Sequence, residues 1–288
     1  MDEPARRERD PIVNRFSLNQ ATIKLADLET AVRVTADAGI PAIGLWREPV
    51  QAHGLKRAAA LVRNAGLRVS SLCRGGYFTM SDAAERRTSM EDNRRAIDEA
   101  AALDAPTLVL VAGGLPEGSR DLIGARARVA ESLAELAPDA QAAGVSLAIE
   151  ALHPMYVSDR AVVSTLGQAL DLAAPFPPEV VGVVVDTFHV WWDPDLREQV
   201  ARAGREGRIA SYQICDWMMP IAQDPLLSRG IPGDGLIDFA SVTQWVRDAG
   251  YTGDIECEVF RRDVWDADPT TVARRARDAY DRLVAPHL

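Results

Sequence analysis

The chain has 288 residues, 47% of them apolar, and a formal net charge of −10 at pH 7. This length suffices for one large α/β domain, while the acidic balance would repel a phosphate backbone and argues against nucleic acid as a ligand. No window approaches the roughly 18 uncharged apolar residues of a membrane span. We therefore expect no membrane contact and a small molecule as the ligand.

The N-terminal segment is charged and contains no apolar core of a signal peptide. We expect residues 1–13 to form a flexible tail and residues 14–288 to form the folded domain. The three cysteines, Cys73, Cys215 and Cys257, have no CxxC spacing, and two of them lie in predicted strands, where a reduced thiol acts as a small apolar group. This pattern indicates a reducing compartment and a cytoplasmic protein.

From residue 15 onward, short apolar runs typical of strands alternate with longer segments of helical period. Strands are predicted over residues 15–19, 42–46, 68–73, 107–111, 146–150, 181–186, 209–215 and 254–258. Helical patterns include residues 28–38, 55–65, 82–103, 125–143, 166–172, 239–249 and 269–283. A glycine stands where a helix is expected to end before the next strand begins in four tripeptides: AGI at 38–40, AGL at 65–67, AGV at 143–145 and AGY at 249–251.

Eight such units predict a closed single-domain (β/α)8 TIM barrel. A doubly wound sheet would use the same units, but no GxGxxG follows a strand, and the GG at 113–114 lacks the third glycine. The only extended irregular stretch expected is 217–237, which is long for a loop. Loops of this length often cover a functional site.

Four predicted strands end at, or next to, a side chain with an oxygen ligand: Glu150, Asp186, Gln213 and Glu258. Active sites of TIM barrels lie at the C-terminal ends of the strands, so these side chains should share one mouth. A buried carboxylate without a partner is costly, which favours a bound cation. Alternatively, Glu150 or Asp186 caps the helix that follows.

Further candidates lie beside these strand ends. His153 and His189 each stand three residues after a predicted ligand, and Trp46 ends the second strand, where it could form an apolar wall against a sugar ring or belong to the core. On the last strand, Glu256 and Glu258 project to one face. We expect Glu258 nearer the mouth and Glu256 about 6.6 Å deeper as a supporting residue, with their roles exchanged if the register shifts.

The combination of Glu150, DTFH at 186–189, YQICDW, RGIPGDGLIDF and IECEVF resembles the sugar isomerase/epimerase family with the xylose-isomerase-like barrel. The resemblance implies one divalent ion held by Glu150, Asp186, the residue at position 213 and Glu258. It also implies substrate contacts from His189 and Arg229. At position 213 the family usually has histidine, whereas this chain has glutamine. An all-oxygen ligand set favours Mn²⁺, with Mg²⁺ or Co²⁺ as alternatives.

The implied reaction is isomerisation or epimerisation of a sugar through a metal-stabilised enediolate, with Glu150 and Glu258 as the groups that remove and return the proton. The alternative is a lyase acting on 3-keto sugars, similar to C-glycoside deglycosidases or keto-inositol dehydratases, with His153 as the base. A non-catalytic metal-binding barrel is the third possibility. Relatives that cut DNA use three zinc ions bound by many histidines. This chain has only four histidines and a net negative charge, which excludes that nuclease activity.

The resemblance also implies partners. The substrate would be a sugar or keto-sugar, and the protein would form homo-oligomers, as barrels of this family often do. A small partner subunit would be expected only for a deglycosidase.

Overall fold

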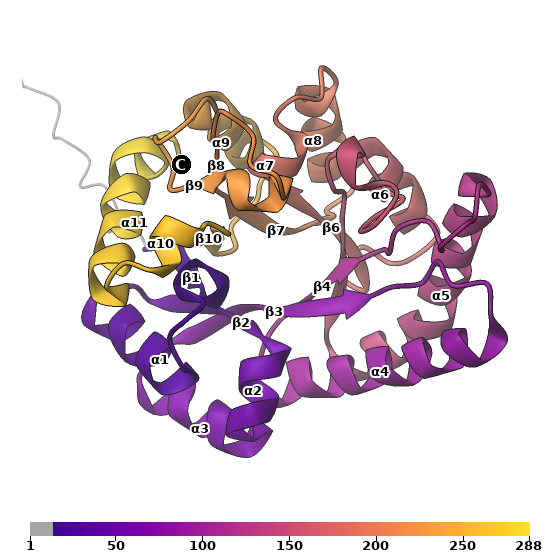
Figure 1. The fold of residues 1–288 in the computed structure, drawn as a ribbon, viewed down its shortest axis with the longest axis horizontal. Helices are drawn as coiled ribbons and strands as arrows, with labels where there is room; N and C mark the ends of the chain where they lie inside the picture. Colours follow the sequence, from indigo (N-terminus) through magenta and orange to yellow (C-terminus); the bar gives the residue numbers. More distant parts are fainter. Residues whose placement is uncertain (1–13) are drawn as a thin grey trace, which may run out of the picture.

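A computed structural model describes residues 14–288, so the tail predicted over residues 1–13 lies outside the described part of the chain. Eight parallel strands close into a barrel in the order β1-β10-β7-β6-β5-β4-β3-β2, which confirms the predicted fold (Figure 1). The barrel strands are β1 (Phe16–Asn19), β2 (Ala42–Trp46), β3 (Arg68–Gly76), β4 (Thr107–Val111), β5 (Ser146–Glu150), β6 (Val181–Asp186), β7 (Ile209–Ile214) and β10 (Ile255–Cys257).

Helices surround this barrel (Figure 1). They are α1 (Leu28–Asp37), α2 (Arg47–His53), α3 (Leu55–Asn64), α4 (Ala83–Ala102), α5 (Leu122–Ala143), α6 (Leu166–Ala173), α8 (Leu196–Arg205), α9 (Phe239–Asp248) and α11 (Pro269–Leu283), with the short α7 (Thr187–Val190) and α10 (Arg262–Trp265) at the ends of strands. The main apolar core packs between strands and helices, and a small cluster of Cys73, Val109, Ala148 and Val184 is separate from it. No helix of residues 14–288 is long and apolar enough to cross a membrane.

The predicted helix ends at glycine are confirmed. Gly39, Gly66, Gly144 and Gly250 all have positive φ, between 68° and 81°. A residue with a Cβ is strained in this left-handed conformation, whereas glycine adopts it readily and lets the chain turn back toward the next strand.

Two of the surrounding helices, α2 and α8, were not predicted. In α8 only Leu196, Val200 and Ala203 are buried, so the apolar stripe is narrow within a ten-residue segment that contains four charged residues. The helix α2 begins directly after β2 and contains Pro49 in its first turn, where proline is tolerated because the N–H it lacks would have no intrahelical partner. Predicted strand bounds agree with the structure to within three residues.

The stretch 217–237 is more ordered than predicted. It contains the 3-10 turn η3 (Pro225–Ser228) and the strand β9 (Arg229–Gly230), which pairs with β8 (Asp216–Trp217) as an antiparallel hairpin. The buried Asp216 carboxylate accepts hydrogen bonds from the backbone N–H groups of Gly233, Gly235 and Ile237 at 2.8 to 3.0 Å. One side chain thus holds the loop that presents Arg229 to the barrel mouth.

Candidate active site at the barrel mouth

The four predicted ligand residues come together at the C-terminal end of the barrel. Asp186 ends β6 in register with Gln213 of β7, and Gln213 is in register with Glu256 of β10. Glu150 ends β5, and Glu258 follows β10. Because strands β5, β6, β7 and β10 are neighbours in the barrel, their ends bring these side chains to one mouth, where Glu150, Gln213 and Glu258 line a cavity and Asp186 lies outside its lining.

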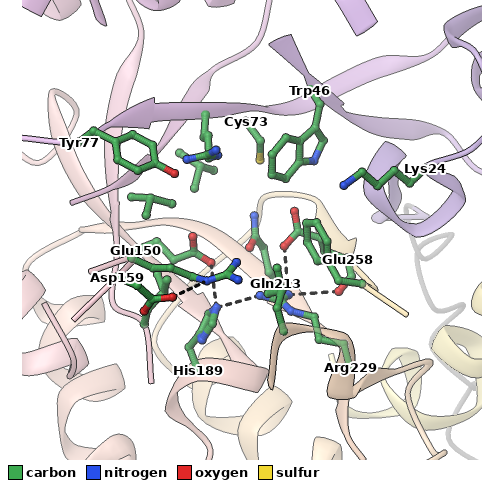
Figure 2. A pocket seen from close by; sticks show the side chains of 17 residues that line it. Lys24, Trp46, Cys73, Tyr77, Glu150, Asp159, His189, Gln213, Arg229 and Glu258 are labelled. Atoms are coloured by element: carbon green, nitrogen blue, oxygen red, sulfur yellow. Dashed lines mark hydrogen bonds and ion pairs between the residues drawn. The ribbon is translucent and has the colours of Figure 1, made fainter. Parts of the chain in front are cut away.

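This cavity has a volume of about 430 Å³. Its lining includes most of the side chains predicted for the site, namely Trp46, Glu150, His189, Gln213, Arg229 and Glu258. Figure 2 shows Glu150 and Glu258 on either side of Gln213, with His189 and Arg229 beneath. A pocket of this size is typical of small-molecule sites.

Arg229 links the acidic side chains. Its Nη1 lies 3.0 Å from Asp186 Oδ2 and 3.0 Å from Glu258 Oε2, and its guanidinium packs between the rings of Phe188 and Phe260. The side chain is 2% exposed. Such a buried cation requires charged partners, which Asp186 and Glu258 supply.

His189 is buried in α7 and remains neutral, because burial and then the neighbouring Arg229 lower its pKa well below the usual value. Its Nε2 lies 2.8 Å from Arg229 Nη2, and its Nδ1 is 3.2 Å from the backbone N–H of His153. Both neighbours are donors, but a neutral imidazole accepts at only one nitrogen. One of these two donors is therefore left without an acceptor, and the tautomer of His189 decides which one.

The carboxyl groups repel one another in the absence of a cation. Burial, followed by the charges of Asp186 and Glu258, raises the pKa of Glu150 well above its ordinary value. Burial also raises the pKa of Glu258 to about 8, although Arg229 opposes this shift. Three carboxylates and one guanidinium leave two negative charges in excess when all are ionised. One divalent cation would neutralise that excess.

The polar atoms at the site fit a cation. Within residues 14–288, Gln213 Oε1 and Asp186 Oδ2 are buried and have no hydrogen-bond partner; the contact of Asp186 Oδ2 with Arg229 is an ion pair without hydrogen-bond geometry. The Gln213 Nε2 donates to Glu256 Oε1 at 3.3 Å, which leaves its Oε1 as the atom without a partner. Buried oxygens without partners are costly, and a hard cation binds such oxygens.

Glu256 occupies a different environment. Its carboxylate lies among donors from Asn19, Ser70, Ser71 and Gln213, and it is absent from the cavity lining. Together with Cys73 and Glu258 it forms a compact group of potential ligands. Because its oxygens already have donor partners, we place no ion there and treat Glu256 as the support of Gln213.

The structure places His153 away from the cavity lining. Its Nδ1 accepts a hydrogen bond from the backbone N–H of Met155 at 3.2 Å, and its ring packs against Trp192 and Trp217. The role of His153 as a base stays a prediction without a supporting contact. Trp46 does line the cavity, and its indole N–H donates to Asn19 Oδ1 at 2.9 Å.

Basic residues of the cavity were not predicted, apart from Arg229. Lys24, Arg74 and Arg160 all contribute to its lining. Arg74 lies in the last part of β3, so an examination of basic as well as acidic residues at strand ends would have found it. Lys24 follows the 3-10 turn η1 (Gln20–Ile23), which comes after the end of β1. A search for basic residues after strand ends would also have found it.

Comparisons with known proteins show what the chain is similar to. The family model described as "Xylose isomerase-like TIM barrel" matches residues 32–283. An inosose isomerase of Bacillus licheniformis is 27% identical over 165 residues, which is 57% of this chain and 57% of that protein. A second inosose isomerase, from Halalkalibacterium halodurans, is 23% identical over 217 residues, covering 74% and 73% of the two chains.

Solved structures are also similar. A Sinorhizobium meliloti 1021 protein is 47% identical, with a TM-score of 0.91 over 94% of this chain and 98% of that chain. The IolI protein with a bound zinc atom is 20% identical, with a TM-score of 0.83 over 95% and 99%. A D-psicose 3-epimerase from Clostridium cellulolyticum H10 is 18% identical, with a TM-score of 0.74 over 93% and 97%. These last two likenesses show a shared fold.

Proposed function

Because the chain belongs to the xylose isomerase-like TIM barrel family, we propose that it is a divalent-metal-dependent enzyme that isomerises or epimerises a sugar or keto-sugar. The observation that carries the proposal is the pair of buried carboxyl groups, Glu150 and Glu258, which line one cavity together with neutral His189 and Arg229. The names of the relatives, inosose isomerase and D-psicose 3-epimerase, support ketohexoses and inososes as the substrates to test.

Glu150, Asp186, Gln213 and Glu258 would hold the ion. When bound, a divalent cation polarises the substrate carbonyl and lowers the pKa of the adjacent C–H group. An all-oxygen set of three carboxylates and one amide favours Mn²⁺ or Mg²⁺ over zinc. The nearby Glu256 contributes by accepting the Gln213 N–H, which keeps the amide oxygen free for the ion.

The protein side chains would carry the proton. One of the two carboxylates, Glu150 or Glu258, takes the proton from the carbon beside the carbonyl, and the electron pair of the broken C–H bond forms the enediolate. Arg229 donates hydrogen bonds to the developing oxyanion. Return of the proton by the other carboxylate to the same carbon gives the epimer, and return to the adjacent carbon gives the isomer.

The test is proton exchange in D₂O with Mn²⁺-loaded protein, using ketohexoses and inososes as substrates. We expect deuterium to enter the carbon beside the carbonyl, as read by NMR. The Glu258→Gln variant should lower this exchange by about 10² to 10⁴. Glu131→Gln is a matched control, because Glu131 is an exposed residue of α5. Absence of exchange across the whole panel would refute the proposal.

The remaining assignments of the proposal concern the cell and the assembly. The three cysteines, Cys73, Cys215 and Cys257, are free and buried, which supports a reducing compartment such as the cytoplasm. We propose a homo-oligomer, which light scattering of the purified protein would test.

A further inference from the structure

Two cationic side chains of the cavity have no acidic partner. Among residues 14–288, the side chains of Lys24 and Arg74 take part in no ion pair or hydrogen bond, although both line the cavity. The other two cations of the lining are paired, Arg229 with Asp186 and Glu258 and Arg160 with acidic neighbours of its own. The cavity therefore carries two cations, Lys24 and Arg74, that form no direct contact with an acidic side chain of the described residues.

Aromatic rings support these two cations instead. The Arg74 guanidinium carbon lies 4.6 Å from the ring centre of Tyr77, and Lys24 Nζ lies 5.0 Å from the ring centre of Trp265. A cation–π contact positions the charge while leaving its N–H donors unused. Figure 2 shows the Lys24 amine directed into the cavity beside Trp46.

The composition of the chain makes Lys24 unusual. Only two of its 32 basic residues are lysines, Lys24 and Lys56, and acidic residues outnumber basic ones by 42 to 32. In a protein of this charge, a concave site with unpaired cations concentrates anions by focusing the local potential. Lysine and arginine also offer only donors, whereas a neutral sugar hydroxyl both donates and accepts.

We propose that the substrate carries an anionic group, a carboxylate or a phosphate, which Lys24 and Arg74 of the cavity lining bind while its carbonyl end lies at the carboxylates. This inference rests on the proposed function and narrows its substrate class to acidic sugars.

The experiment measures binding by calorimetry to Mn²⁺-loaded protein, with three ligands of equal carbon length: D-fructose, D-fructose 6-phosphate and D-fructuronate. We expect at least one anion to bind about tenfold or more tightly than the neutral ketose, as a charge-assisted contact would give. The preference should weaken in 1 M salt. Tighter binding of the phosphate or of the carboxylate identifies which anionic group the site takes.

Variants test the residues. Lys24→Met and Arg74→Met should each reduce the preference for the anion several-fold, and the double variant should bind all three ligands alike. Lys56→Met is the matched control, since Lys56 is an exposed lysine of α3, and it should leave the preference unchanged. Equal affinities for all three ligands in the unmodified protein, or an anion preference that survives in the double variant, would overturn the inference.

Binding also separates this inference from the proposed function. Deuterium exchange with a neutral ketose and no preference for anions would overturn the inference alone. Conversely, an anion preference that depends on Lys24 and Arg74, without exchange of any substrate, would overturn the proposed function and leave the anion site standing.

Discussion

Replacing Glu150 with glutamine should raise the stability of the metal-free protein and reduce the stabilisation that a bound metal ion gives. Glu150 belongs to a group with Asp186 and His189 whose potential ligand atoms lie within 4.8 Å of one another. Arg229 pairs with Asp186 and Glu258, and no ion pair joins it to Glu150 in the described part of the chain. Without metal, Glu150 is thus either charged and repelled or protonated.

The cost of either state can be worked out. Two like charges at the upper limit of 4.8 Å for this group repel by about 3.5 kcal/mol at an effective dielectric constant of about 20. Protonation at pH 7 of a carboxyl group whose ordinary pKa is 4.5 costs at most about 3.4 kcal/mol, since each pH unit is worth about 1.36 kcal/mol. Glutamine avoids both costs. Glu150→Gln should therefore raise the metal-free free energy of unfolding by about 2 to 3 kcal/mol.

The sign of the pH dependence follows from the raised pKa of Glu150. A carboxyl group with a raised folded-state pKa contributes its stability fully below the unfolded value and loses it as pH rises toward the folded value. The wild type should lose this stability between pH 5 and pH 7, whereas Glu150→Gln should not. The advantage of the variant should fall below about 1 kcal/mol at pH 5.

The assay is urea unfolding in EDTA at pH 5 and pH 7, followed by a thermal melt with Mn²⁺. The wild type should be stabilised by Mn²⁺ because the ion binds the folded state, and Glu150→Gln should lose most of that increase. The exposed Glu131→Gln variant should behave as the wild type in both experiments. A metal-free Glu150→Gln protein less stable than the wild type at pH 7, or one with a full Mn²⁺ response, would refute the charge argument.

Three further predictions concern other parts of the chain. Gln213→His should shift metal preference toward Zn²⁺ by about tenfold or more in competition dialysis, since imidazole suits zinc better than an amide oxygen; an unchanged metal ratio would exclude Gln213 as a ligand. Asp92 pairs with buried Arg47, which lowers the pKa of Asp92, so Asp92→Asn should cost about 1 kcal/mol at pH 7, discounted for exposure. Urea unfolding should show that cost shrinking as pH falls toward the unfolded-state pKa and below it; a cost independent of pH would contradict the ion pair. Gly76→Ala should destabilise by about 3 kcal/mol or more, because φ is 114° and the new Cβ would meet the Val111 carbonyl oxygen; wild-type urea stability would contradict this.

The barrel was predictable because its signals are local and repeat. Each strand is a short apolar run, and the left-handed glycines, such as Gly39 and Gly144, mark helix ends in phase with it. The helix α8 escaped prediction for a physical reason. Its burial rests on a stripe of three residues, so tertiary packing determines a helix that the apolar content of the segment does not reveal.

The site was predictable only in part, because contacts across the barrel leave little trace in the sequence. The positions of Glu150 and Asp186 at the ends of predicted strands were enough to predict that both lie at the mouth of the barrel. The sequence did not indicate that Asp216 holds the hairpin of Arg229, since these bonds run from one side chain to distant backbone groups. His153 shares its spacing with His189, yet it is the N-cap of the 3-10 turn η2 (Pro154–Tyr156), and its ring packs on Trp192 and Trp217.

Glutamine at position 213 illustrates why the support of a ligand matters as much as its identity. An amide can present either oxygen or nitrogen, so a glutamine in a metal site needs a group that fixes its orientation. Glu256, the register partner of Gln213 on β10, accepts the Gln213 N–H and is itself surrounded by serine and asparagine donors. Glu256 in β10 and Glu258 just after it therefore have two different tasks: the Glu256 carboxylate orients the amide, and Glu258 lines the cavity.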